Sequence, residues 1–587
     1  MTILIVATVV AYLPALRGGF VFDDELYVSN NPTLRSTDGL RAIWLHPAAT
    51  TQYYPLVFTT YWIEYRRWGL NPLGYHATNI VLHAANTLLV RSVLCRLGVP
   101  GAVFAAGIFA LHPVHVESVA WITERKDVLS GMFYLLAVMT WLRFFATRRW
   151  RSYVLSVALF LCALLSKSMT CTLPLTLLLV AWWTEGRQWR RKIAPVLPFL
   201  VISVGLGLVT MWRESLFHSP ATATPPLALL QRGLVAARAL WFYAGKLLWP
   251  VNLMALYPRW QVDVNAAWQY AFVVGAIAVP LILWLARSRF GKGPLVAVLF
   301  FAITLGPASG LLRFDFQRLS YVADRFQYLA SLGPIALLTA VLATSRERWR
   351  TLRPWAAHVV TALVLCALAL LTWEHARVYA DEETLWRDTI LKNPGAASGH
   401  YNLGLLLLDQ GKLDEAIQQF AAAVAIDPQY SEAHLNWGVA ADRRGDLDEA
   451  MAQYRAELEI NPASAHARNN LATALFRLGQ VDEALEQFAI AARADPSYAE
   501  AQNNWGLALA LQGRTDEAVE RYVAALRINP DLADAHKNLG VALVKKGALH
   551  EALGHLQKAV RLNPRDNDAR AQLDAVMHLR EGPVSGP

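Results

Sequence analysis

The pattern of hydrophobic positions changes at about residue 376, from long apolar runs with short polar turns to a regular mixture of polar and apolar positions. The apolar runs are near the roughly 20 residues that a helix needs to cross the hydrocarbon layer of a membrane, where a helix satisfies its own backbone polar groups. The first run has neither a basic leader nor a small-residue cleavage site, so we expect it to be retained as a span. The sequence predicts eleven spans, over residues 2–16, 74–95, 101–120, 128–146, 151–167, 170–184, 193–212, 265–286, 294–312, 325–344 and 355–373.

Clusters of Arg and Lys predict the orientation, because such clusters mark cytoplasmic turns. They are Arg148, Arg149 and Arg151; Arg187, Arg190, Arg191 and Lys192; Arg287, Arg289 and Lys292; and Arg346, Arg348, Arg350 and Arg353. If the further apolar stretch 227–250 crossed fully, the last two clusters would lie outside, so we expect a re-entrant or interfacial amphipathic helix there. The odd span count then predicts a cytoplasmic N-terminus and an extracytoplasmic location for everything after residue 373.

The second part of the chain repeats with a period of 34 residues. The repeated features are a proline (394, 428, 462, 496, 530, 564), a glycine (411, 445, 479, 513, 547) and a Glu-Ala pair (415, 449, 483, 517, 551). The glycine is expected to end the first helix of each unit, Asp-Glu-Ala to start the second, and the proline to close the unit. This period and pattern are typical of tetratricopeptide repeats, which stack into a superhelix.

The predicted fold class is therefore all-α: a polytopic membrane helix bundle followed by a repeat superhelix. We expect a membrane domain over 1–375, a half-repeat connector over 376–396, five repeats over 397–566 and a tail over 567–587. Asparagines recur on the first helix of each unit, and an asparagine ladder on a concave face suits hydrogen bonding to an extended acceptor peptide. The alternative is that they only cover the solvent side. These asparagines are Asn402, Asn436, Asn470, Asn504 and Asn538.

Composition agrees with a membrane protein, because only 17% of residues are charged and 55% are hydrophobic, against roughly 25% charged in soluble chains. The net charge of +9 does not indicate nucleic-acid binding, since the basic surplus lies in turns between apolar runs. A disulfide scaffold is excluded, because the 4 cysteines lie within apolar runs. Usage of Arg, Ala and Trp suggests a bacterial source, and hence the inner membrane.

Candidate chemistry lies in four loops that are expected to face outward: 17–73, 112–127, 166–168 and 313–324. Asp23 and Asp24 are adjacent, and neighbouring carboxylates resist simultaneous ionisation, which suits one of them to general-base work. They are alternatively ligands of a divalent cation or a solvated acid cluster. No cofactor is otherwise indicated.

The second outward loop carries the stretch His-Pro-Val-His-Val-Glu at 112–117 and Glu-Arg-Lys-Asp at 124–127. A zinc site at the two histidines is disfavoured, because the usual helical spacing is i, i+4 and no third ligand pattern is visible. We therefore predict no metal site at these histidines. Four cations, by contrast, suit a phosphate at headgroup depth, with helix-end snorkelling as the alternative for each. They are Arg125, Lys126, Lys167 and Arg325.

Six motifs together resemble the transmembrane and tetratricopeptide repeat-containing proteins, regarded as protein O-mannosyltransferases of the multi-span GT-C class. They are Phe-Val-Phe-Asp-Asp (20–24), Tyr-Tyr-Pro-Leu (53–56), Trp-Gly-Leu-Asn-Pro-Leu-Gly-Tyr-His-Ala-Thr-Asn-Ile-Val-Leu-His (68–83), His-Pro-Val-His-Val-Glu-Ser-Val-Ala-Trp (112–121), Glu-Arg-Lys-Asp-Val-Leu-Ser (124–130) and Ala-Asp-Arg-Phe-Gln-Tyr-Leu (323–329).

The resemblance implies transfer of a sugar, with mannose expected, from a polyprenyl- or dolichyl-phosphate carrier to Ser or Thr of a protein. It assigns the essential acid of the first outward loop to Asp23, with Asp24 as competitor, and a second acid to Glu117. Relatives often have a basic residue where Tyr54 stands. The rival hypotheses are a non-catalytic membrane scaffold that recruits partners through its repeats, which needs no clustered acids, and a transporter or flippase, for which no inverted repeat is visible.

Overall fold

The computed structural model describes residues 1–217, 227–312, 315–348 and 354–581. Three sequence features lie partly outside them: the fourth basic cluster with Arg350 and Arg353, the last loop predicted to face outward with residues 313–314, and the tail with residues 582–587. The chain forms two compact units, Met1–Ala396 and Ala397–Pro587. The described residues contain helices and no strand, which confirms the all-α fold class.

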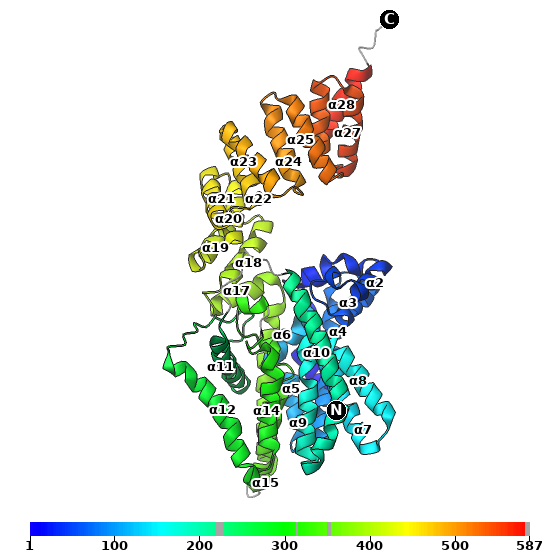
Figure 1. The fold of residues 1–587 in the computed structure, drawn as a ribbon, viewed down its shortest axis with the longest axis vertical. Helices are drawn as coiled ribbons and strands as arrows, with labels where there is room; N and C mark the ends of the chain where they lie inside the picture. The colour runs from blue at the N-terminus through cyan, green and yellow to red at the C-terminus, as the bar shows by residue number, and fades with distance from the viewer. Residues whose placement is uncertain (218–226, 313–314, 349–353, 582–587) are drawn as a thin grey trace. The chain divides into compact units, whose positions relative to one another are not determined.

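Every apolar run of the first unit forms a helix, and the helices pack side by side as a bundle (Figure 1). The helices that correspond to the predicted spans are α1 (Thr2–Ala11), α4 (Pro72–Arg96), α5 (Ala102–Leu111) with α6 (Val116–Ala120), α7 (Arg125–Thr147), α8 (Trp150–Leu164), α9 (Leu173–Thr184), α10 (Ile193–Phe217), α12 (Tyr270–Leu285), α14 (Gly293–Leu305), α15 (Leu332–Arg348) and α16 (Pro354–Ala376). Between them lie α2 (Thr37–Leu45), α3 (Pro55–Trp68), α11 (Leu229–Leu248) and α13 (Arg287–Phe290).

The predicted count of eleven spans is not confirmed. Among the described residues, four helices are long and apolar enough to cross a membrane, namely Ile122–Thr147, Gln188–Arg213, Ala267–Leu285 and His358–Tyr379. The pair Ala102–Leu111 and Pro113–Ala120, which bends by 55° at its break, is apolar enough only when its two helices are taken together, either as one broken span or as a re-entrant loop. Other apolar helices are shorter, such as Thr2–Ala11 and Trp150–Leu164. At 1.5 Å per residue, a helix of ten residues does not reach across the roughly 30 Å hydrocarbon layer.

Helix α4 was also predicted as a span, and its polar residues explain its lower hydropathy. His76, Asn79, His83 and Asn86 follow one another at helical spacing and are all buried. Asn79 and Asn86 donate hydrogen bonds to backbone oxygens of Trp121 and Val128, respectively. The polar stripe of α4 therefore holds the segment from 121 to 128 instead of facing lipid.

Helix α17 (Glu382–Lys392) follows the last apolar helix and belongs to the first unit. Asp381 caps its first turn by accepting a hydrogen bond from the backbone N–H of Thr384, at 2.8 Å. Leu385 and Trp386 are buried. The connector is thus a packed helix, not an extended linker.

The second unit consists of paired helices that follow the predicted period (Figure 1). The pairs are α18 (Ala397–Asp409) with α19 (Leu413–Ile426), α20 (Ser431–Arg444) with α21 (Leu447–Ile460), α22 (Ala465–Arg477) with α23 (Val481–Ala494), α24 (Ala499–Leu511) with α25 (Thr515–Ile528), and α26 (Ala533–Lys545) with α27 (Leu549–Leu562). The repeated glycine ends the first helix as expected: Gly445, for example, has φ +95°, a conformation that other residues rarely adopt.

The residues assigned to a tail include a further helix, α28 (Asn567–Glu581). Its Ala569 and Val576 are each 1% exposed. A terminal helix of this kind covers the apolar face of the last pair, which repeat arrays need because each unit otherwise packs only on its neighbours.

Candidate active site

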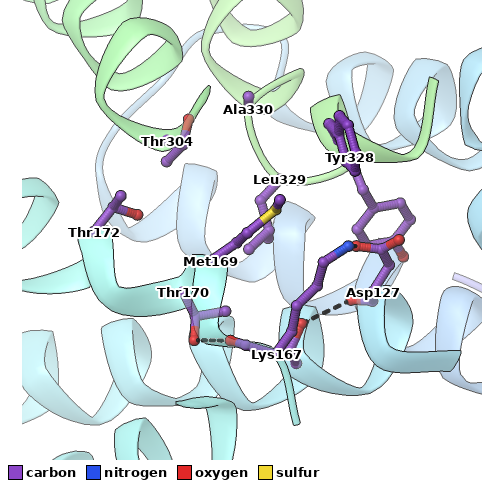
Figure 2. Close-up of a pocket in the computed structure, with 11 residues that line it drawn as sticks. Asp127, Lys167, Met169, Thr170, Thr172, Thr304, Tyr328, Leu329 and Ala330 are labelled. Atoms are coloured by element: carbon purple, nitrogen blue, oxygen red, sulfur yellow. Dashed lines mark hydrogen bonds and ion pairs between the residues drawn. The ribbon is translucent and has the colours of Figure 1, made fainter. Parts of the chain in front are cut away.

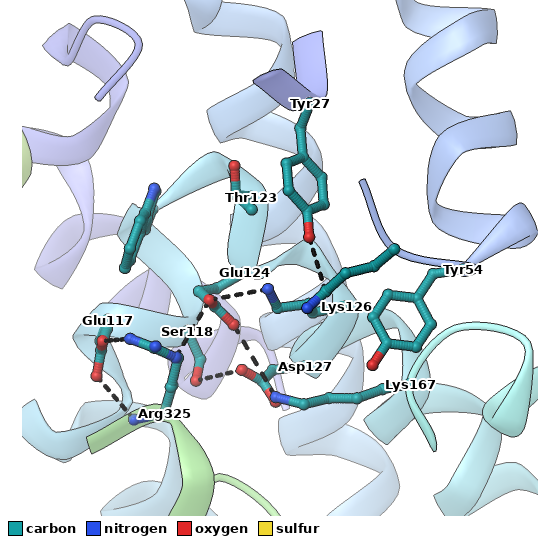
Figure 3. A network of polar contacts seen from close by, with 12 residues as sticks. Tyr27, Tyr54, Glu117, Ser118, Thr123, Glu124, Lys126, Asp127, Lys167 and Arg325 are labelled. Atoms are coloured by element: carbon teal, nitrogen blue, oxygen red, sulfur yellow. Dashed lines mark hydrogen bonds and ion pairs between the residues drawn. The ribbon is translucent and has the colours of Figure 1, made fainter. Parts of the chain in front are cut away.

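A buried network of three cations and three carboxylates lies where segments 117–127 and 167 meet the segment of Arg325 (Figure 3). The carboxylate of Glu124 is at its centre: Oε1 lies 3.1 Å from Nζ of Lys126 and 3.3 Å from Nε of Arg325, and Oε2 lies 3.9 Å from Nζ of Lys167. Glu124 is 1% exposed. One carboxylate therefore contacts every cation of the network.

Arg325 is held by a second acid, Glu117. The backbone N–H of Arg325 donates to Oε2 of Glu117 at 2.8 Å, and its guanidinium pairs with Oε1. The guanidinium also lies over the ring of Phe316, at 4.4 Å from the centroid, and over that of Trp121, at 5.4 Å. These contacts orient the guanidinium of Arg325. Its pKa is raised above the ordinary value despite burial, because Glu117 and Glu124 are adjacent.

Lys167 pairs with the third acid, Asp127, at 2.5 Å. The other oxygen of Asp127 accepts a hydrogen bond from Ser118 at 3.3 Å. Lys167 and Asp127 line one side of a small pocket whose other walls carry hydroxyl and apolar side chains (Figure 2). These other walls include Ser130, Met169, Thr170, Thr172, Thr304 and Leu329.

Asp23 and Asp24 differ sharply in their surroundings. Asp24 is completely buried, and its carboxylate accepts hydrogen bonds from the backbone N–H of Val21 at 2.9 Å and from the N–H and hydroxyl of Thr123 at 2.8 and 2.5 Å. The carboxylate of Asp23, in contrast, has no hydrogen bond or ion pair within the described parts of the chain, and it is half-buried. Of the two carboxylates, that of Asp23 thus has all its acceptor positions open to a substrate hydroxyl, whereas three hydrogen bonds occupy most of those of Asp24.

The electrostatics of the two acids follow from these positions. Burial raises the pKa of Asp23 above its ordinary value of 3.8, and the neighbouring charges of Lys126 and Arg325 act in the opposite direction. Burial raises the pKa of Asp24 to about 7, which its hydrogen bonds from Thr123 and Val21 partly offset. Both shifts bring a carboxyl group closer to the range in which a general base operates.

Arg125 lies apart from the other three cations. It is completely buried, pairs with Glu64 at 2.5 Å and donates to Oδ1 of Asn79 at 2.8 Å and to the backbone oxygen of Tyr75 at 2.8 Å. These contacts tie α7 to α3 and α4. The structure therefore brings Lys126, Lys167 and Arg325 together and leaves Arg125 in a separate network.

The two histidines of the second loop are engaged with neighbouring groups. The ring of His115 hydrogen-bonds with the backbone oxygen of Phe109 and the hydroxyl of Ser331, at 2.8 and 3.0 Å, and His112 with the backbone oxygen of Leu247 at 3.0 Å. In the described ranges no group of three or more His, Cys, Asp or Glu is arranged to hold a metal ion.

Tyr54 faces the same region (Figure 3). Its hydroxyl lies 3.3 Å from that of Ser168, the residue after Lys167. Tyr54 therefore contributes an uncharged hydroxyl group at this position.

The asparagine ladder of the repeats makes hydrogen bonds between neighbouring units. Asn504 donates to Asn469 at 3.1 Å and Asn538 to Asn503 at 3.0 Å, each 35 positions earlier. Asn436 donates to the hydroxyl of Tyr401 at the same separation, at 3.2 Å. Asn470 accepts from Asn469, and Asn402 makes no such bond among the residues that the structure describes. All five remain half-exposed.

The sequence-based site lacked Glu124, Asp127 and Asp324. Burial and the nearby charge of Glu117 raise the pKa of Asp324 to about 8, and Tyr257 donates a hydrogen bond to it at 2.8 Å. The signal for Glu124 and Asp127 was visible in Glu-Arg-Lys-Asp, because two acids three residues apart lie on one side of a helical turn. No sequence signal links Tyr257 to Asp324.

Known families match both parts of the chain. Residues 75–212 match the family described as dolichyl-phosphate-mannose-protein mannosyltransferase. Glu117, Glu124, Lys126 and Lys167 lie within that match, whereas Asp23 and Arg325 lie outside it. Tetratricopeptide-repeat families match residues 367–431, 401–465, 443–503, 506–547 and 533–566.

Three curated relatives are similar to most of this chain. Protein O-mannosyl-transferase F38B6.6 of Caenorhabditis elegans is 25% identical over 461 residues, covering 74% of this chain and 63% of that protein. Protein O-mannosyl-transferase TMTC1 of Homo sapiens is 28% identical over 491 residues, covering 72% and 55%. Tmtc1 of Drosophila melanogaster is 26% identical over 521 residues, covering 69% and 59%.

The predicted resemblance is thereby confirmed, and the matched region and the apolar helices point to a membrane protein. The chain spans between 55% and 63% of the length of these relatives.

Proposed function

We propose that this protein is a membrane glycosyltransferase that transfers mannose from a polyprenyl- or dolichyl-phosphate carrier to Ser or Thr hydroxyls of proteins. The similarity to mannosyltransferases and the buried charged network support this class of reaction. The observation that carries the proposal is the carboxylate of Asp23. It is free of hydrogen bonds from described residues and lies within the field of Lys126 and Arg325.

Asp23 acts as the general base in this reaction. The hydroxyl oxygen of the acceptor attacks the anomeric carbon of the sugar, its proton passes to Asp23, and the bond from that carbon to the phosphate oxygen breaks. One displacement of this kind inverts the configuration at the anomeric carbon. Asp24 does not share the role, because three hydrogen bonds occupy its carboxylate.

The phosphate leaving group gains negative charge as the bond breaks. Lys126, Lys167 and Arg325 stabilise that charge, since fixed cations in a site with little water act more strongly than in solution. Without donor, the same cations are held in place by Glu124, Asp127 and Glu117. These acids keep the cations oriented before the phosphate arrives.

The reaction takes place on the extracytoplasmic side, with the N-terminus in the cytoplasm and the repeats on the outer side, and the bacterial inner membrane is the proposed location. Loops 17–73, 112–127, 166–168 and 313–324 were assigned to the outer face from the charge pattern. The convergence of Asp23, Glu117, Lys167 and Arg325 supports a common side for these loops.

The repeats bind the protein acceptor and raise its concentration near the site, a role that needs no catalytic residue of their own. The half-exposed Asn402, Asn436, Asn470, Asn504 and Asn538 are the proposed contacts.

The test is mannosyl transfer from synthetic polyprenyl-phosphate mannose to a Ser/Thr peptide by the full chain in detergent. Asp23→Asn removes the base and is expected to lower kcat by at least about 100-fold. Glu25→Gln is the matched control, because Glu25 is an exposed acid two positions away, and its rate should equal that of the wild type. Transfer by Asp23→Asn at the wild-type rate contradicts the proposal.

A further inference from the structure

The backbone of Phe22, the residue before Asp23, is in an unusual conformation. Its φ is +48°, in the left-handed region. A bulky side chain is rarely found there, and such a conformation persists only where the surrounding structure enforces it. The direction of the Asp23 side chain depends on this backbone angle, because Asp23 is the next residue.

The surrounding structure comes from helix α17, which leads from the last apolar helix to the repeats. The ring of Trp386 packs edge-on against the ring of Phe22, with 5.0 Å between centroids and 90° between planes. Trp386 is 1% exposed, and its indole N–H donates to Glu382 of the same helix at 3.2 Å, which fixes the ring. A large, buried aromatic ring thus packs against the side chain of Phe22.

Phe22 also contacts the opposite side of the site. Its ring lies 6.1 Å from that of Trp121. Trp121 donates its indole N–H to the backbone oxygen of Val21 at 3.3 Å, and the guanidinium of Arg325 lies over its ring. The side chains of Trp386, Phe22 and Trp121 therefore form a continuous aromatic row that ends at Arg325.

The C-terminal end of α17 holds a second loop of the site. Nζ of Lys392 donates to the backbone oxygen of Leu253 at 2.9 Å. The side-chain amide of Asn393 donates to the backbone oxygen of Leu256 at 3.0 Å. Tyr257 follows directly and donates to Asp324, the neighbour of Arg325. Upstream of the helix, the backbone oxygen of Ala380 accepts from the N–H of Gly19 at 2.8 Å.

We propose that α17 is a positioning element of the active site, in which Trp386 holds Phe22 in its left-handed conformation and so aims Asp23 at the cations. This inference rests on the proposed role of Asp23. Trp386 and Phe22 act through Asp23 and are therefore positioning residues. Helix α17, which leads to the repeats, thus holds the loop that carries Asp23.

The test compares two substitutions of Phe22 in the full chain. Phe22→Ala removes the ring contact with Trp386 that supports a non-glycine residue at positive φ, and kcat should fall by about 10- to 100-fold because the base is misplaced. Phe22→Gly also removes the ring, but glycine adopts positive φ without steric cost. We expect the kcat of Phe22→Gly to be at least about fivefold higher than that of Phe22→Ala. If the ring acted through its packing alone, the kcat of Phe22→Gly would instead be the lower of the two.

Trp386 supplies the second measurement. Trp386→Ala should lower kcat while the KM for polyprenyl-phosphate mannose changes less than about twofold, because the cations remain in place, and Trp386→Phe should restore most of kcat. Leu391→Ala is the matched control, since Leu391 is on the same helix and 79% exposed. If Trp386→Ala does not fold, the comparison at Phe22 decides the question.

The outcomes separate this inference from the proposed function. If Asp23→Asn is inactive but Phe22→Gly is no more active than Phe22→Ala, the positioning role is overturned and the role of Asp23 stands. An unchanged kcat in a folded Trp386→Ala variant overturns the positioning role as well. If Asp23→Asn is active, the proposed function itself fails.

Discussion

Asp24 and Thr123 are 99 positions apart in the chain, yet one oxygen of the Asp24 carboxylate accepts hydrogen bonds from both the backbone N–H and the hydroxyl of Thr123. This contact joins the loop that carries Asp23 to the segment that carries Glu124 and Lys126. The acid without a protein hydrogen bond and the cations are thus held together by a neighbouring acid whose carboxylate already accepts three hydrogen bonds.

Asp24→Ala should therefore act on stability. It leaves the buried N–H groups of Val21 and Thr123 without acceptors, which costs about 2–4 kcal/mol of unfolding free energy. Asp23→Asn should change stability by less than about 0.5 kcal/mol, as for a side chain without partners. Thermal unfolding in detergent measures both. A stable but inactive Asp24→Ala protein contradicts this division and makes Asp24 the base.

Glu124→Gln should strengthen donor binding. The carboxylate competes with the donor phosphate for Lys126, Lys167 and Arg325, so its neutralisation should lower the KM for polyprenyl-phosphate mannose, and the Ki of inorganic phosphate, on the order of tenfold, equal to about 1.4 kcal/mol. The same exchange at the exposed Glu25 should change neither constant. A higher KM in Glu124→Gln is incompatible with competition.

The pH dependence of kcat/KM should follow the ionisation of Asp23. The carboxylate form is the base, so the rate rises with pH, and the midpoint lies above 3.8 because burial raises the pKa of Asp23. Lys126 acts in the opposite direction. Lys126→Met removes that cation and should move the midpoint to higher pH. A pH–rate profile of both proteins checks the sign, and a shift to lower pH refutes the assignment.

Arg125→Met should lower protein stability and not donor affinity. Arg125 is the buried partner of Glu64, and removal of one member of a buried ion pair costs about 3–5 kcal/mol, because the other charge remains without compensation. The double variant Arg125→Met, Glu64→Gln should recover a large part of that loss. Abundance in membranes and thermal unfolding report the effect. A fully stable Arg125→Met with a raised donor KM restores the phosphate-binding role.

Asn402 and Asn504 should respond differently to substitution by Ala. Asn504 donates to Asn469 of the preceding repeat, so Asn504→Ala should lower the unfolding free energy of the array by about 1 kcal/mol. Asn402 has no such partner in the described chain, so Asn402→Ala should leave stability unchanged and raise the KM of the peptide acceptor. Unchanged acceptor KM in both variants removes the ladder from acceptor binding.

Prediction from sequence succeeded where the signal is periodic. The 34-residue period placed the helix ends of every repeat, because glycine and proline act on their own backbone and need no distant partner. Prediction from sequence was weaker for the bundle of apolar helices. The length of an apolar run does not say whether a helix is straight, as the 55° bend between Leu111 and Pro113 illustrates. The polar residues of α4 were counted as part of a span, although they face protein.

The chemical character of the site was readable from the loops between the apolar runs, since acids and cations beside apolar runs are costly and invite a functional role. The sequence did not indicate which of these ionisable residues has which role in the site. Asp23 and Asp24 are the same residue type in the same motif. The position of Thr123 distinguishes them, because Thr123 donates hydrogen bonds to the carboxylate of Asp24 and none to that of Asp23. Likewise Arg125 and Lys126 are adjacent cations, but helical geometry turns them toward Glu64 and Glu124, respectively.

By itself, the sequence determined the helical class, the repeat architecture and the set of ionisable residues, because these depend on local periodicity and on residue type. Only the tertiary structure decided which charges meet, which acid stays free and that α17 supports the loop of Asp23. Hydrogen bonds and ring contacts between segments tens to hundreds of residues apart depend on how the helices pack, and no local pattern records that packing.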